Sequence, residues 1–150
     1  MTPEQFKLMR DIIEESIPFN KELGLELLEA QDGKARLAFD FKKSLVGNFV
    51  SQVLHGGVIA SAMDVVGACA VMSTFSNERP LIGMGTVDIR VDYLRPGSGT
   101  RFFSTGEVIR PGRMLSSTRM ELYNQDDQLL AIGTAIYRAS RKDEPQTPNL

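Results

Sequence analysis

The sequence contains very few of the residues that hold metals or form disulfides. Among its 150 residues there is one cysteine, Cys69, and one histidine, His55. A single cysteine excludes an intramolecular disulfide, and one cysteine with one histidine cannot complete a zinc site of the Cys/His type. We therefore expect no metal and no cofactor, and we interpret Cys69 as a packing residue.

A strong net charge and a long apolar run are also missing. The formal net charge is −2, which does not indicate a nucleic-acid-binding protein. The main apolar run, residues 58–72, is shorter than the ~20 residues that a bilayer requires and includes Asp64. Residues 1–7 have no signal-peptide pattern. These features favour a cytoplasmic protein in which the apolar run is a buried helix.

Two widespread catalytic and nucleotide-binding motifs are absent. No Gly-x-Ser-x-Gly sequence marks a serine nucleophile. Gly83-Met84-Gly85 lacks the third glycine and the following helix of a phosphate-binding loop. Serine-hydrolase and phosphate-loop chemistry are therefore disfavoured.

The composition fits one domain over residues 1–150, because 42% of the residues are hydrophobic and can build a core. Apolar residues at helical spacing predict a short amphipathic helix over residues 3–16, which Pro18 ends. We expect the polar tail from about residue 140 to fray.

The rest of the chain reads as strands around one long helix. Asp32-Gly33 between two β-like runs, residues 23–30 and 35–41, predicts a hairpin. Because strands in short succession pair antiparallel, the pattern predicts an α+β fold with one helix on a face of an antiparallel sheet. The remaining segments are a loop over 42–55, the helix over 58–72, a break at 77–80, and strands over 86–93, 101–110, 115–123 and 129–138.

The most informative stretch is residues 48–75, where His55-Gly56-Gly57 precedes the apolar helix. A helix that is apolar all round belongs in a core, and its one charge, Asp64, is costly to bury unpaired. Asp64 therefore has either a structural partner on a neighbouring element or a catalytic task. Paired glycines at a helix start leave N–H groups that can bind an oxyanion, although His55 can also be a plain polar cap.

These residues resemble a known family. Residues 54–60, with Asp64 nine residues after the histidine and Asn48 seven before it, resemble the hotdog-fold acyl-CoA thioesterases of the PaaI-like kind. Residues 86–96 resemble the long strand that follows the helix in that family. The resemblance covers roughly residues 20–139. It implies a hotdog fold, in which an antiparallel sheet wraps one helix, and hydrolysis of acyl-CoA.

The spacing of Gly57 and Asp64 points to a shared site. They are seven residues apart and lie on nearly one face of the helix, roughly 10 Å apart along its axis. A thioester carbon needs the oxyanion donor and the base within about 3 Å. Two antiparallel helices from different subunits can supply both, so we expect a homodimer, with a dimer of dimers left open. The family resemblance implies the same arrangement.

The candidate catalytic residues are Asp64, Gly57, Asn48, His55 and Thr86. The Gly57 N–H would polarise the thioester carbonyl, and Asp64 would act as general base on water or as nucleophile. Asn48 would hold the water or the carbonyl, and His55 would orient the loop or contact the thioester. Thr86 matches the family's hydroxyl residue, which binds the carboxylate or water. The plainer alternatives are a turn role for Asn48 and an ordinary strand role for Thr86.

The strand pattern also predicts the direction of the Thr86 side chain. Thr86 is in phase with Asp88 and Arg90 along a strand of period two. We therefore expect Thr86 on the polar face of its strand.

Two arginine-containing turns are candidates for the phosphates of CoA, which arginine binds well. They begin at Arg95 and at Arg110 and lie at opposite ends of one hairpin, so within a subunit only one should reach a given nucleotide. We favour Arg110, Gly112 and Arg113. The alternative is that both sets are solvated turn residues.

Two other functions remain open. One is a hydratase or dehydratase that pairs His55 with a carboxylate, and the other is an acyl-CoA-binding protein without catalysis. The acyl group itself cannot be read, because the apolar side chains would accept aliphatic or aromatic chains alike.

Overall fold

The computed structural model describes residues 1–75 and 81–141, without the side chains of residues 82 and 141. The elements, in chain order, are α1 (Pro3–Asp11), the π-helical turn η1 (Ile12–Ser16), α2 (Pro18–Leu23), β1 (Glu26–Gln31), β2 (Lys34–Asp40), the 3-10 turn η2 (Lys43–Leu45), β3 (Val46–Asn48), β4 (Val53–Leu54), α3 (Gly56–Met72), β5 (Leu81–Tyr93), β6 (Arg101–Arg110), β7 (Leu115–Asn124) and β8 (Leu129–Arg141).

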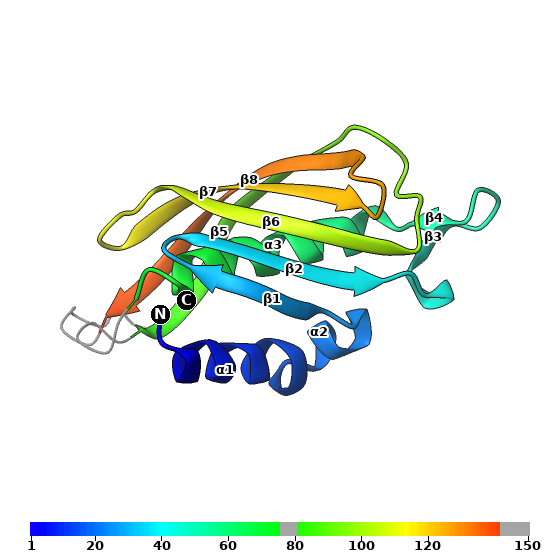
Figure 1. The fold of residues 1–150 in the computed structure, drawn as a ribbon. Helices are drawn as coiled ribbons and strands as arrows, with labels where there is room; N and C mark the ends of the chain where they lie inside the picture. The colour runs from blue at the N-terminus through cyan, green and yellow to red at the C-terminus, as the bar shows by residue number, and fades with distance from the viewer. Residues whose placement is uncertain (76–80, 142–150) are drawn as a thin grey trace.

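A six-stranded antiparallel sheet in the order β1-β2-β6-β7-β8-β5 wraps around α3 (Figure 1). The helix lies against the inner face of the sheet and contacts all six strands. The predicted α+β fold, with an antiparallel sheet, one long helix and a short N-terminal helix, is confirmed. No helix in the described part of the chain is long and apolar enough to cross a membrane.

The core is the interface between α3 and the sheet. Gly67 of α3 lets the sheet approach closely, because an added Cβ would overlap the Tyr137 hydroxyl. Cys69 is buried in the same interface, as predicted for a packing residue. Burial raises the pKa of the Cys69 thiol to about 12, so the thiol stays protonated at neutral pH.

The predicted β1–β2 hairpin is confirmed. Gln31 pairs with Lys34 across a two-residue turn, in which Asp32 and Gly33 have φ of 51° and 81°. Positive φ at both central positions is the type I′ geometry that matches the twist of the strands. The Gly33 N–H donates to Ser73 Oγ at 2.9 Å, which ties this turn to the C-terminal end of α3.

Three boundaries differ from the sequence predictions. The helix expected over residues 3–16 is α1 followed by η1, and Pro18 begins α2, because a first-turn proline needs no N–H partner. The loop expected over residues 42–55 contains η2, β3 and β4.

The ends of three strands also differ. β1 begins at Glu26 and not at Leu23, because Leu23 ends α2. β5 begins at Leu81, and β8 continues to Arg141, past the expected start of the tail. The predicted break at 77–80 and the rest of the tail lie outside the described residues.

The two edges of the sheet are treated differently. β1 is covered by the N-terminal helical segment, where Glu14 Oε1 accepts the Leu27 N–H at 2.8 Å. β5, the opposite edge, pairs only with β8 within the described chain. Its Val87 and Tyr93 side chains are 59% and 53% exposed. An edge of 13 residues with unpaired backbone groups is a template for pairing with another strand.

Candidate active site

The start of α3 holds the first half of the candidate site. His55 is the N-cap, with extended backbone, and its Nδ1 accepts the Gly57 N–H at 2.9 Å. Both residues are exposed. The plainer role, a histidine cap, is therefore realised in this chain. The Gly57 N–H can reach a substrate oxygen only when the imidazole turns aside or shares the proton.

Asp64 forms the second half. It is half-buried, and its Oδ1 accepts hydrogen bonds from Thr86 Oγ1 at 2.8 Å and from Tyr137 Oη at 3.1 Å. Among the described residues, no cation pairs with Asp64. The helix carboxylate is thus held by hydroxyl groups of the sheet and not by a salt bridge.

Thr86 reaches Asp64 because of an irregularity in β5, and the sequence argument for its direction was wrong. Thr86 pairs with Tyr137, whereas Asp88 pairs with Ile136, so Val87 is an extra residue on β5. This bulge reverses the phase of the strand, and Thr86 faces α3 while Asp88 lies on the outer face. Alternation alone cannot show where such a residue is inserted.

Tyr137 was missed by the sequence analysis. It is fully buried on β8, and its hydroxyl also donates to the Asp64 main-chain carbonyl at 2.7 Å. Burial, followed by the nearby Asp64 carboxylate, raises the pKa of the Tyr137 hydroxyl well above its ordinary value, so it remains a donor. Tyr137 could have been identified as the cross-strand partner of Thr86, but only if the register between β5 and β8 had been known.

Asn48 is committed to a turn. Its Oδ1 accepts the N–H groups of Val50 and Ser51 at 3.0 and 3.1 Å, closing the loop between β3 and β4. No hydrogen bond of the described residues joins Asn48 to Asp64 or to Gly57. The turn role is therefore realised within one chain.

The two arginine turns lie at opposite ends of β6, as predicted. The turn after Arg95 adjoins the start of α3, since Gly97 O accepts the Leu54 N–H at 3.0 Å. The turn with Arg110 and Arg113 lies near Asp64 instead, because Met114 O accepts the Ala139 N–H, two residues from Tyr137.

Within the second turn, Gly112 has a conformational task. Its N–H faces Ser116 Oγ at 3.4 Å, and an added Cβ would overlap the Leu115 carbonyl oxygen. This close approach explains the glycine without any ligand.

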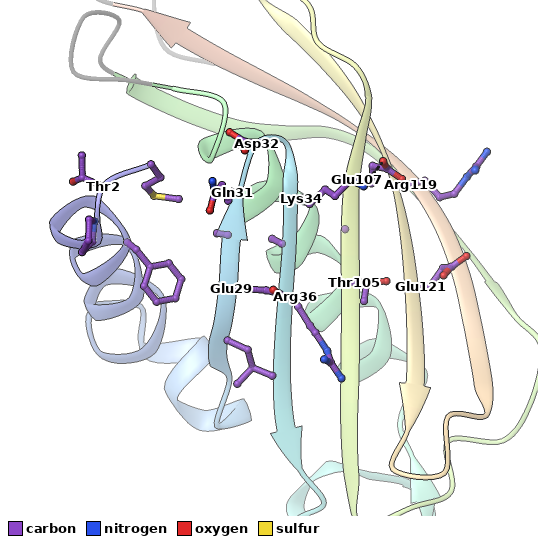
Figure 2. Close-up of a pocket in the computed structure, with 17 residues that line it drawn as sticks. Thr2, Glu29, Gln31, Asp32, Lys34, Arg36, Thr105, Glu107, Arg119 and Glu121 are labelled. Carbon is purple, nitrogen blue, oxygen red and sulfur yellow. Dashed lines mark ion pairs between the residues drawn. The ribbon is translucent and has the colours of Figure 1, made fainter.

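The described part of the chain has one cavity away from these residues and a second beside the start of α3. The larger, of about 970 Å³, lies between α1 and the outer face of the sheet (Figure 2). Side chains of both charges line it, including Arg36, Glu107, Arg119 and Glu121, and it lacks every candidate catalytic residue. The smaller, of about 380 Å³, adjoins His55 and Gly57 at the start of α3. No group of three potential metal ligands occurs among the described residues.

The comparisons with known proteins agree with this architecture. The thioesterase superfamily profile matches residues 51–131. A Salmonella typhimurium protein named medium/long-chain acyl-CoA thioesterase YigI is 43% identical over 148 residues, which cover 91% of this chain and 96% of that protein.

Solved structures confirm the hotdog fold. A thioesterase-superfamily protein from Shewanella oneidensis superposes with a TM-score of 0.80 at 36% identity, over 93% of this chain and 100% of that one. The Escherichia coli PaaI protein from the phenylacetic acid degradation operon gives 0.78 at 20% identity, over 91% and 94%, which shows the fold alone. This chain belongs to the thioesterase superfamily.

Proposed function

We propose that the protein hydrolyses acyl-CoA thioesters to a free acid and CoA at a site shared by two subunits. The observation that carries this proposal is Asp64, a carboxylate in an apolar helix that receives two hydroxyl donors and no cation from the described residues. Such a group can take a proton from water. The similarity to an acyl-CoA thioesterase supplies the substrate class.

The reaction needs a base and an oxyanion donor. Asp64 takes a proton from water while the water oxygen bonds to the thioester carbon, and the carbonyl oxygen becomes an oxyanion. The Gly57 N–H donates to that oxyanion in place of His55 Nδ1. The intermediate then collapses with loss of the CoA thiolate, and the proton held by Asp64 passes to the thiolate and regenerates the carboxylate. In the alternative, Asp64 attacks directly, CoA leaves, and water hydrolyses the resulting anhydride.

Two subunits are needed because the Gly57 N–H and the Asp64 carboxylate of one helix are too far apart to act on the same thioester. Gly57 and Asp64 are about 10 Å apart along α3, from the rise of an α-helix. The β5 edge, which has no partner strand among the described residues, and the exposed Val87 beside Thr86 support pairing with a second copy. An antiparallel homodimer places Gly57 of one subunit against Asp64 of the other. Further association into a dimer of dimers is compatible with this site.

We assign the acyl chain to the smaller cavity. Phe19, Leu23, Leu45 and Val58 supply an apolar lining beside Gly57. The cavity volume, about 380 Å³, lies within the range of ~300–1,000 Å³ typical of small-molecule sites. This lining and the name of the YigI relative favour a medium or long aliphatic chain.

The CoA phosphates are assigned to the turn that carries Arg110, Gly112 and Arg113. This turn lies close to the Asp64 half of the candidate site, and arginine is suited to phosphate oxygens. In the shared site, Asn48 and His55 of the partner's helix start would border the thioester, once His55 releases the Gly57 N–H.

A panel of acyl-CoAs of increasing chain length, with a reagent that reports free thiol, tests the function. We expect release of CoA that is fastest for medium or long chains and is lost in Asp64→Ala. Addition of water across a double bond without CoA release would favour the hydratase. Binding without turnover would favour an acyl-CoA-binding protein.

A further inference from the structure

The two oxygens of the Asp64 carboxylate have different surroundings. Both hydroxyl groups, Thr86 Oγ1 and Tyr137 Oη, donate hydrogen bonds to Oδ1, at 2.8 and 3.1 Å. No donor of the described residues is bonded to Oδ2. A carboxylate can accept from several donors, so this one-sided pattern leaves one oxygen available.

We propose that Oδ2 is the reacting oxygen of Asp64 and that Tyr137 is the positioning residue that makes it so. This inference rests on the proposed function of the site. Tyr137 holds Oδ1 toward the sheet together with Thr86, so that Oδ2 faces the substrate water or the thioester carbon. Tyr137 itself touches no reacting atom.

Tyr137 can fix this orientation because its hydroxyl bridges two parts of the same residue. It lies 2.7 Å from the Asp64 main-chain oxygen and 3.1 Å from Oδ1. A rotation of the carboxylate about the side-chain torsions would break the second contact. The phenol ring is fully buried, so the hydroxyl cannot follow such a rotation into solvent.

The surrounding fold is built to admit this hydroxyl. Gly67 lies three residues after Asp64, on the same side of α3, and any Cβ at Gly67 would overlap the Tyr137 oxygen. On the other side, the bulge at Val87 turns Thr86 toward the same carboxylate oxygen. A helix glycine, a strand bulge and a buried tyrosine thus converge on Oδ1.

The test is Tyr137→Phe, which removes one oxygen and keeps the ring. We expect kcat to fall by about 10- to 100-fold, as for a misplacement of a catalytic group by up to 1 Å, with KM changed less than about twofold. Tyr123→Phe is the matched control, because its hydroxyl donates to Glu121 Oε2 at 2.5 Å in the same sheet, away from Asp64. The control should keep the wild-type kcat.

Repeating the substitution in the Asp64→Ala variant distinguishes an effect on the position of the carboxylate from an effect on folding. In Asp64→Ala the carboxylate is gone, so adding Tyr137→Phe should leave the residual rate, measured at high enzyme concentration, unchanged. If the hydroxyl is merely structural, Tyr137→Phe should lower the rate by the same factor with and without the Asp64 carboxylate, and should lower Tm well beyond the Tyr123→Phe control. That result would overturn the proposal, and so would a wild-type kcat in Tyr137→Phe.

A Tyr137→Phe variant that does not fold and a wild type without activity have different consequences. If Tyr137→Phe does not fold, Gly67→Ala keeps the phenol and displaces its hydroxyl, and the same selective loss of kcat is expected; an unchanged kcat there overturns the proposal. An inactive wild type would instead remove the proposed function itself, and this inference with it.

Discussion

A heterodimer of two inactive variants gives the sharpest test of the shared site. One subunit carries Asp64→Ala, which removes the base. The other carries Gly57→Pro, which removes the proposed oxyanion donor at the second position of α3, where proline is tolerated. The lost hydrogen bond to His55 costs about 0.5–1.5 kcal/mol. A Cβ at Gly57 would lie 2.9 Å from His55 Nδ1, but the imidazole is exposed and can turn away.

The expected activity follows from the arrangement of the two sites. If Gly57 of one subunit serves Asp64 of the other, one site of the heterodimer carries both lesions and the other carries neither. The heterodimer should then show about half the wild-type activity per dimer. The Asp64→Ala homodimer should keep about 1% or less, since general-base catalysis contributes ~10²–10⁴-fold, so the contrast is about 50-fold. Sites formed within single subunits would both remain inactive.

The assay uses co-expression with two different tags and sequential purification, followed by kcat at saturating acyl-CoA. A heterodimer of wild type with Asp64→Ala is the control and should also keep about half the activity, because one site is intact. An active control beside an inactive Asp64→Ala/Gly57→Pro heterodimer would refute the shared site. A monomeric wild type at the assay concentration would refute it sooner.

Four further outcomes are expected. Asp64→Ala should lower kcat by about 10²- to 10⁴-fold and still form a folded oligomer by circular dichroism and size-exclusion chromatography; near-normal turnover would remove Asp64 from the mechanism. Arg113→Ala should raise KM for acyl-CoA more than it lowers kcat, whereas an effect confined to Arg95→Ala would place the CoA phosphates at the other turn. Val58→Phe should narrow the smaller cavity and lower kcat/KM for long chains by about 10-fold or more relative to short ones, and a uniform loss would argue against an acyl-chain site there. Cys69, with its pKa raised to about 12, should react with a thiol reagent at pH 8 only when the protein unfolds; rapid labelling of the native protein would contradict its burial.

The sequence was sufficient for the elements whose signals are local. The apolar run that became α3 needs only its own composition to be assigned to a core. The turn at Asp32-Gly33 needs only two residues that accept positive φ. β6 runs from Arg101 to Arg110, as predicted, and ends just before the Pro111-Gly112 turn. The resemblance added the hotdog fold, which the solved relatives confirm.

Local signals were insufficient where another element decides the outcome. In the sequence, Pro18 predicts the end of a helix, yet it begins α2, because a proline suits both places. Asn48 and His55 are occupied within their own loops, and neither contact could be distinguished in advance from a catalytic role. In each case the same residue type is compatible with two different local structures, and contacts with the rest of the fold select one of them.

Composition and spacing along the chain are enough to predict that one carboxylate, Asp64, stands in a buried helix after a glycine pair, and that strands surround this helix. How that carboxylate is held depends on contacts between elements that lie far apart in the chain. The bulge at Val87 turns Thr86 inward, and the register of β8 against β5 places Tyr137 beside it. The physical reason is that side-chain direction in a sheet depends on pairing between strands far apart in the chain, and one inserted residue reverses it.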